Sequence, residues 1–164
     1  MWVEMKVRGL ALDPLSNMPI IILRDEEEKR SLPIWVGIFE ANAIALELEK
    51  IATPRPMTHD LINEMLSELE ISCAKVSVTE LRENTFYASI TLKMNGKEVE
   101  IDSRPSDALA LAVRTSAPIF AAESVIEESA IEFEHEVEDT EEVVEKFKDF
   151  LDNVTPEDFA GSDS

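Results

Sequence analysis

The sequence has little of what marks secreted, membrane-spanning or disulfide-bonded proteins. Its 164 residues include one cysteine, Cys73, which cannot form an internal disulfide. No charged-then-apolar leader opens the chain, and the strongest apolar uncharged stretch, Ser31 to Phe39, is far shorter than a membrane span. We therefore expect a cytoplasmic protein that does not cross a membrane.

Basic residues are also scarce, which bears on the possible partners. The formal net charge is −20, with 35 acidic and 15 basic residues. From Glu123 onward there are 16 acidic and 2 basic residues, a balance of −14, which leaves −6 for the residues before it. Because binding along a polyanion depends on many Lys and Arg side chains, this composition argues against a broad nucleic-acid groove. It leaves open a small phosphate site on the mildly acidic part.

The remaining composition suits one domain with an appendage. Hydrophobic residues make up 45% of the chain, enough for one core at this length. We expect the domain to span residues 1–126 and an acidic tail to span residues 127–164. Within the tail, the segment from Glu141 to Leu151 places its apolar residues on one face, which predicts a short amphipathic helix.

Two successive parts of the domain show the same order of strands followed by a helix. Alternating or continuous apolar runs predict strands, and runs of strong helix formers predict helices. The first part has strands near residues 3–8, 18–23 and 31–36, then helices at 39–51 and 58–70. The second has strands near residues 75–79, 86–92 and 99–101, then a helix at 106–116. A last strand is expected from Pro118 to Val125.

An internal duplication accounts for this order. Laying Ala43–Leu46 on Ala108–Leu111 gives an offset of 65, which also pairs Ile34 and Val36 with Val99 and Ile101. Chance similarity of Ala-Leu-rich helices is the alternative. The predicted fold is therefore α+β, with a duplicated strands-then-helix unit, a mostly antiparallel sheet and buried helices. The run from Ala108 to Val113 has no polar residue, so sheet, helix or a second subunit must cover it, and we favour a homo-oligomer.

The segment from Asp102 to Asp107 is the most informative candidate site, because it joins a strand to that apolar helix. Pro105 suits a first helical turn, and Ser103 or Ser106 could cap it. A phosphate bound there would meet the amide donors of the helix N-terminus, the Ser106 hydroxyl and the guanidinium of Arg104.

Carboxylates near this corner raise the question of a metal. Asp102 and Asp107 would repel a phosphate unless a divalent cation, Mg²⁺ or Mn²⁺, bridged them. The simpler alternative is a salt bridge from Arg104 to an aspartate, with Asp107 in a favourable place for the helix dipole. Glu40, at the corresponding corner of the first unit, and Glu47, two turns further on, could supply further oxygens or be ordinary exposed carboxylates.

A second polar cluster is predicted at the start of the helix after residue 57. It contains Arg55, His59 and Asp60, and Thr58 is the expected cap. His59 could act as an acid or base near neutral pH, or be a surface residue beside a cap. His135 lies in the acidic tail and carries no further signal.

Three motifs in these regions resemble the bifunctional nuclease domain family. They are Leu32–Ala41 followed by Ala43–Leu46, Arg55–Leu61, and Asp102–Ala108, within a resemblance that covers about residues 1–126. The resemblance implies nuclease activity on DNA and RNA. We therefore expect a metal-dependent phosphodiesterase that acts on nucleic acid.

The roles expected within that enzyme follow from the two polar clusters. Asp102, Asp107 and Glu40 would hold the cation, Arg104 would contact phosphate and His59 would carry a proton. The alternative is a non-catalytic oligomeric module that binds an anion or a partner at the same corner.

Overall fold

The computed structural model describes residues 1–129, which contain seven strands and four helices. In chain order these are β1 (Trp2–Leu12), β2 (Pro19–Asp25), β3 (Ser31–Trp35), α1 (Ile38–Leu48), α2 (Thr58–Glu68), β4 (Ser72–Arg82), β5 (Thr85–Met94), β6 (Lys97–Ser103), α3 (Pro105–Thr115), β7 (Ile119–Ala122) and α4 (Glu123–Glu128). The predicted α+β class is confirmed.

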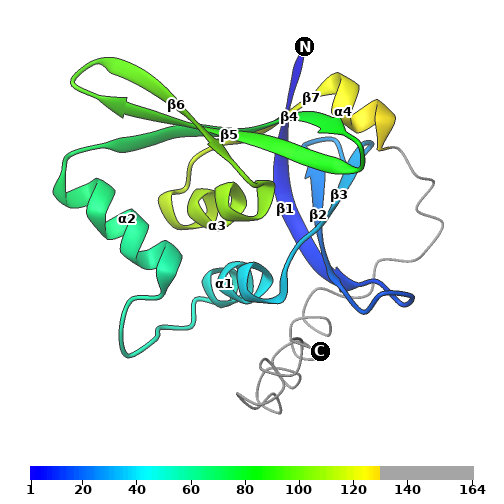
Figure 1. Ribbon diagram of the computed structural model, residues 1–164, viewed down its shortest axis with the longest axis horizontal. Coiled ribbons are helices and arrows are strands. Elements are labelled where there is room, and N and C mark those ends of the chain that lie inside the picture. Colours follow the sequence, from blue (N-terminus) through cyan, green and yellow to red (C-terminus); the bar gives the residue numbers. More distant parts are fainter. Residues whose placement is uncertain (130–164) are drawn as a thin grey trace.

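All seven strands belong to one sheet with the order β3-β2-β1-β7-β4-β5-β6. Neighbouring strands are antiparallel except β4 and β7, which are parallel. The sheet is strongly twisted, so that its β1–β3 part and its β4–β6 part run at a steep angle to each other (Figure 1). Each three-stranded part lies on one side of β7, and each edge strand leads into a helix. This order is compatible with the predicted duplication, which stays a prediction.

The turn chemistry explains how the second meander closes. Asn95 and Gly96 have φ of 51° and 79°, a pair of positive values that a two-residue hairpin between β5 and β6 requires. The end of the domain differs from expectation, because β7 stops at Ala122 and the chain continues as α4. The predicted strand over Pro118–Val125 is therefore wrong in its second half, since a short apolar run does not distinguish strand from helix.

Helices α1 and α3 lie side by side on one face of the sheet (Figure 1). Five consecutive residues of α3, from Ala108 to Ala112, are buried, and alanines on both helices allow close approach. The sheet, α1 and α2 all contact α3 within one chain. The predicted burial of α3 is confirmed, and one chain is enough to account for it.

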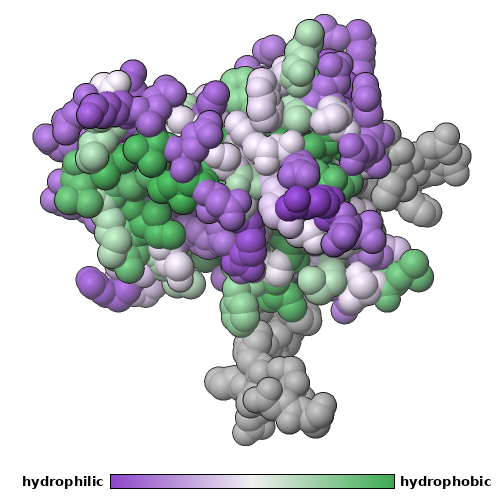
Figure 2. All heavy atoms as spheres, turned by 45° about the horizontal axis from the view of Figure 1, so that its top comes forward, coloured by the Kyte–Doolittle hydropathy of each residue, from purple (hydrophilic) through white to green (hydrophobic). Residues whose placement is uncertain are grey.

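By contrast, α2 buries little of its apolar surface. His59 is its one buried residue. Large hydrophobic side chains of α2 and of the β5–β6 hairpin are exposed, and Figure 2 shows a green area on this side of the molecule. We call this set the α2–β6 apolar surface; its members are Leu61, Ile62, Met65, Leu69, Met94, Val99 and Ile101.

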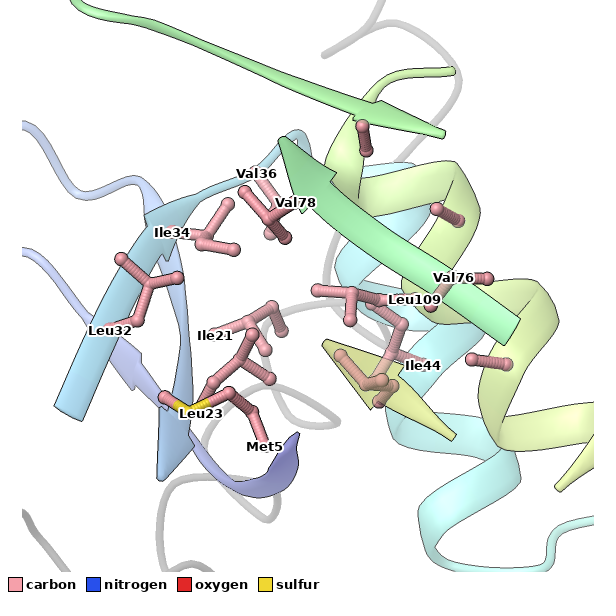
Figure 3. Close-up of a cluster of buried hydrophobic side chains, with 14 of the residues drawn as sticks. Met5, Ile21, Leu23, Leu32, Ile34, Val36, Ile44, Val76, Val78 and Leu109 are labelled. Carbon is pink, nitrogen blue, oxygen red and sulfur yellow. The ribbon is translucent and has the colours of Figure 1, made fainter. Parts of the chain in front are cut away.

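The core connects the two parts of the sheet through α1 and α3. Figure 3 shows Ile21 and Ile34 of the first part facing Val78 of the second, with Ile44 and Leu109 from the two helices beside them. All five side chains are buried. Truncating such a residue to alanine typically costs about 2–5 kcal/mol, so the relative placement of α1 and α3 is well determined by packing.

Within residues 1–129 no helix combines the length and apolar character that crossing a membrane requires. The predicted boundary between residues 126 and 127 falls inside α4. The predicted helix over Glu141–Leu151 and His135 lie outside the described residues.

Candidate functional site

The candidate site is built around the corner where β6 ends and α3 begins. Arg104 is the N-cap residue of α3, with extended backbone angles, and Pro105 is the first helical residue. Proline suits this position because its φ is already helical and its missing N–H has no partner to lose. Neither predicted serine caps the helix: Ser103 Oγ donates to the carbonyl of Arg104, and no side chain caps α3. The first-turn amides are therefore available to a ligand.

Arg104 connects the two helix N-termini that face each other. Its Nε donates to Asp107 Oδ2 at 2.9 Å, and its Nη2 lies 2.8 Å from both Asp107 Oδ2 and Glu40 Oε1. The hydrogen bonds that Arg104 donates to Asp107 and to Glu40 raise its pKa above the usual value, and the bond to Asp107 contributes most. The Arg104 side chain is 65% exposed, so these contacts leave much of its guanidinium open to solvent.

The close approach at Gly37 determines where the Glu40 carboxylate lies. Gly37 is the N-cap of α1, and a Cβ added there would overlap Glu40 Oε2. The Glu40 side chain is 15% exposed and points back over the start of its own helix toward Arg104. The two strand-to-helix corners are therefore joined by an Arg104–Glu40 ion pair, which the sequence did not predict.

His59 joins this group from the start of α2. Its Nε2 lies 2.9 Å from Asp107 Oδ1, and the His59 and Asp107 side chains are 8% and 33% exposed. Asp107 thus uses one carboxylate oxygen for His59 and the other for Arg104. The resulting chain, His59–Asp107–Arg104–Glu40, connects α2, α3 and α1; we call it the polar relay.

A second ion pair lies behind the polar relay and was not predicted. Arg114 Nε donates to Asp60 Oδ1 at 2.6 Å, and the Arg114 side chain is 3% exposed. Arg114 also donates to the carbonyls of Ala110 and Ala43, both at 2.9 Å. Arg114 is a lone cation near the end of an apolar helix, and this feature of the sequence could have indicated a buried ion pair. We call Arg114 with these acceptors the Arg114 clamp, because it joins α1, α2 and α3.

Asp60 has a pKa below its ordinary value because of this pair. Burial is the largest influence and by itself raises the pKa, but hydrogen bonds from Arg114 and from the Met57 amide outweigh it. Met57 is the N-cap of α2, and its backbone N–H donates to Asp60 Oδ2 at 3.0 Å. Thr58, the expected cap, is instead the first helical residue.

The other predicted residues are placed apart from the polar relay. Asp102 is exposed on β6 and has no side-chain bond to another described residue. Its neighbour Ile101 is paired with Ile90 on the face that packs toward the helices, so Asp102 points to the opposite face. Arg55 and Glu47 line a separate hollow of about 300 Å³ beside Asp60. The predicted cluster of Arg55, His59 and Asp60 is therefore not one site. His59 contacts Asp107, Asp60 contacts Arg114, and Arg55 lines the hollow.

The carboxylates, as they are arranged, do not fit a divalent cation. Among residues 1–129 no group of three or more His, Cys, Asp and Glu side chains is placed to hold a metal ion. Glu40 and Asp107 both bind the same Arg104 Nη2, so a cation between them would have to displace a guanidinium. The predicted ligand set of Glu40, Asp102 and Asp107 does not converge in this arrangement.

Comparison with known proteins identifies the family. The bifunctional nuclease domain profile matches residues 21–134, which include α1, α2, α3 and the whole polar relay. The chain belongs to the bifunctional nuclease domain family. An uncharacterized protein of Mycobacterium tuberculosis is 39% identical over 162 residues, covering 95% of this chain and 97% of that protein.

Plant relatives share the domain within longer chains. Bifunctional nuclease 1 of rice (Oryza sativa subsp. indica) is 27% identical over 110 residues, 65% of this chain and 33% of the rice protein. Bifunctional nuclease 1 of Arabidopsis thaliana is 29% identical over 116 residues, 68% of this chain and 36% of that protein. The chain therefore spans about a third of the plant nucleases it matches.

Proposed function

We propose that this protein is a nuclease that hydrolyses phosphodiester bonds in DNA and RNA at the α3 corner. The observation that carries the proposal is the exposed Arg104 side chain, held by Asp107 and Glu40 beside the uncapped N-terminus of α3. Membership of the family and the printed activity of the plant relatives support it. A phosphate at this corner would meet a planar cation and free backbone amides together.

The residues of the polar relay suit the two halves of a hydrolytic step. Water attacks the phosphorus as the bond to the leaving oxygen breaks, and the attacking water loses one proton. Asp107 is the more exposed member of the His59–Asp107 pair, so we assign it the role of proton acceptor. Arg104 and the α3 amides balance the negative charge that gathers on the phosphate oxygens. The leaving oxygen takes its proton from solvent.

We propose for His59 a role other than the proton carrier expected from the sequence. With 8% of its side chain exposed, it has little access to a substrate. We propose that His59 Nε2–H donates to Asp107 Oδ1 and thereby fixes which carboxylate oxygen faces the water. The expected proton carrier is thus a positioning residue for Asp107.

Dependence on Mg²⁺ or Mn²⁺ stays part of the proposal as a property of the substrate-bound protein. Glu40 and Asp107 are the carboxylates nearest the proposed phosphate position, but both hold Arg104, so they would take up a cation only after substrate phosphate had drawn the guanidinium away. Asp102, on the other face of β6, is the least suited of the three expected ligands.

A homo-oligomer and a cytoplasmic location also stay proposals. The α2–β6 apolar surface supports the first, because large exposed apolar areas rimmed by polar residues mark interaction sites. Beside it, β6 is an edge strand, whose free backbone groups can pair with another strand. A second copy of this chain, pairing β6 with β6 and covering Val99 and Ile101, is the proposed occupant.

A non-catalytic module that binds an anion or a partner is the second candidate. The observation that favours it is charge: the balance of −6 before the tail offers no broad basic groove for a polymer. Such a module would use Arg104 and the α3 amides for binding alone.

The experiment that separates the candidates is cleavage of a labelled single-stranded DNA and a labelled RNA. Purified protein should cut both with Mg²⁺ or Mn²⁺ and stop with chelator. Arg104→Met removes the cation at similar length and should lower the rate at least tenfold. Arg8→Met, on β1 away from the polar relay, is the matched control and should cut like the wild type. Absence of cleavage with every divalent metal would favour the binding module.

A further inference from the structure

A pocket of about 580 Å³ has Arg104 in its wall but is not lined by His59, Asp107 or Glu40, the other members of the polar relay. Its walls are the end of β3 with Trp35, the α1 N-cap Gly37, the start of β5 with Phe86, and the start of α3 with Arg104 and Ser106. The end of α4 forms the remaining wall. This volume falls within the range of small-molecule sites, and the proposed reaction at the polar relay does not use the pocket.

Ser106 brings a hydroxyl-bearing side chain into the wall of the pocket. Ser106 is 6% exposed, it lines the pocket, and its hydroxyl makes no hydrogen bond to any residue in the described part of the chain. Ser106 also belongs to the first turn of α3, whose amides have no side-chain cap. An anion at the Arg104 end of the pocket would satisfy the hydroxyl and the amides together.

The other end of the pocket is aromatic. Phe86 is partly buried against the core, while Trp35 is 39% exposed. The Trp35 indole N–H donates to Asp13 Oδ2 at 3.0 Å, which holds the ring in one orientation. Both residues line the pocket, and aromatic rings offer π faces to a flat ligand.

We infer that this pocket binds the base of a nucleotide whose phosphate lies at Arg104, Ser106 and the α3 amides. The inference rests on the proposed function for the position of the phosphate and adds the base subsite. A base can enter such a pocket only when it is unpaired and unstacked, so single strands are the preferred substrate class. The phosphate then lies between the base pocket on one side and Asp107 on the other.

The test uses adenosine monophosphate, ribose 5-phosphate and inorganic phosphate as probes. Trp2→Phe leaves Trp35 as the single tryptophan. Adenosine monophosphate should quench Trp35 fluorescence and bind at least fivefold more tightly than ribose 5-phosphate, because stacking contributes a factor of that order per base. Equal affinity for the two, or no quenching, would overturn the inference.

A substitution pair tests the aromatic wall directly. Phe86→Leu keeps apolar packing but removes the π face. It should weaken the binding of adenosine monophosphate at least fivefold and leave the affinity for inorganic phosphate unchanged. Tyr87→Leu, the next residue on β5 and on its opposite face, is the control and should bind like the wild type. Cleavage of single strands with unchanged nucleotide affinity in Phe86→Leu would refute the base pocket and leave the proposed hydrolysis standing. If the protein binds the nucleotide through Phe86 but cleaves neither DNA nor RNA, the base pocket stands and the proposed hydrolysis is refuted.

Discussion

His59 Nε2 lies 2.9 Å from Asp107 Oδ1, although the two residues are 48 positions apart in the chain. The contact joins the first turn of α2 to the first turn of α3. Because Asp107 also holds Arg104, a change at His59 should reach the guanidinium that we propose contacts phosphate.

Two substitutions at His59 distinguish positioning from proton transfer. His59→Gln places an amide N–H near the position of Nε2, whereas His59→Ala leaves no donor. If His59 positions Asp107, Gln should keep most of the kcat and Ala should lose at least tenfold, with KM little changed in both. Equal loss of kcat in both variants, with wild-type melting temperatures, would show that His59 itself transfers the proton.

The Arg114 clamp should matter for stability rather than for chemistry. Arg114→Met keeps the length of the side chain but leaves Asp60 and two backbone carbonyls without their donor. Breaking a buried pair in this way costs about 3–5 kcal/mol, which denaturant unfolding would detect. Arg82→Met, an exposed arginine on β4, is the control and should change the free energy of unfolding by less than about 1 kcal/mol. Equal effects of the two substitutions would contradict the clamp.

The same ion pair predicts how stability changes in acid. The Asp60 pKa is lower in the folded protein than in the unfolded chain, so Asp60 stabilises the fold at pH values above the ordinary carboxylate pKa of about 3.9. That contribution is lost as the pH falls through the lowered folded-state pKa. Asp60→Asn should therefore flatten the dependence of unfolding free energy on pH below about 4. An unchanged pH dependence in Asp60→Asn would show that Asp60 is not the responsible group.

Oligomer formation through the α2–β6 apolar surface can be measured by light scattering after size exclusion. Val99→Lys with Ile101→Lys should convert the oligomer to a monomer and leave the melting temperature of a dilute sample little changed, because both side chains are exposed. Leu15→Lys, an exposed residue on the β1–β2 turn, is the control. A wild-type protein that is already monomeric would refute the proposal.

The acidic tail should weaken nucleic-acid binding rather than support it. Residues 130–164 contain 13 acidic and 2 basic residues, so their removal takes away most of the negative charge and keeps α4 whole. Like-charge repulsion predicts that the truncated protein binds a single-stranded oligonucleotide at least as tightly at one fixed salt concentration. Weaker binding after truncation would place part of the tail in the site.

Much of the fold could be predicted because its signals are local. The alternation in β1, the Asn95-Gly96 turn and the apolar run of α3 each depend on neighbouring residues alone. Even the contact from Arg104 to Asp107 follows from helical spacing of three. The end of β7 was missed because its short apolar run fits a strand or a helix equally.

The partners across the site could not be predicted, because they depend on how the helices pack. Glu40 reaches Arg104 over 64 positions and Arg114 reaches Asp60 over 54, and both contacts need α1, α2 and α3 to meet on one face. Spacing in the chain placed His59 and Asp60 in one cluster, whereas the two point to different partners. Asp102 lies apart from the polar relay for a simpler reason. Side chains alternate along β6, so Asp102 points to the face of the sheet opposite to that of Ile101.

The most direct test of the account compares the cleavage rates of Asp107→Asn and Asp102→Asn proteins on single-stranded DNA and RNA. Both substitutions remove one carboxylate charge at the same strand-to-helix corner, but Asp107 alone belongs to the polar relay. Loss of the proposed proton acceptor should lower kcat by about 10²–10⁴, while Asp102→Asn should cleave at the wild-type rate. A contaminating nuclease would raise the measured cleavage rates of both proteins equally, so the comparison between them controls for it. A folded Asp107→Asn protein that cleaves as fast as Asp102→Asn would contradict the account.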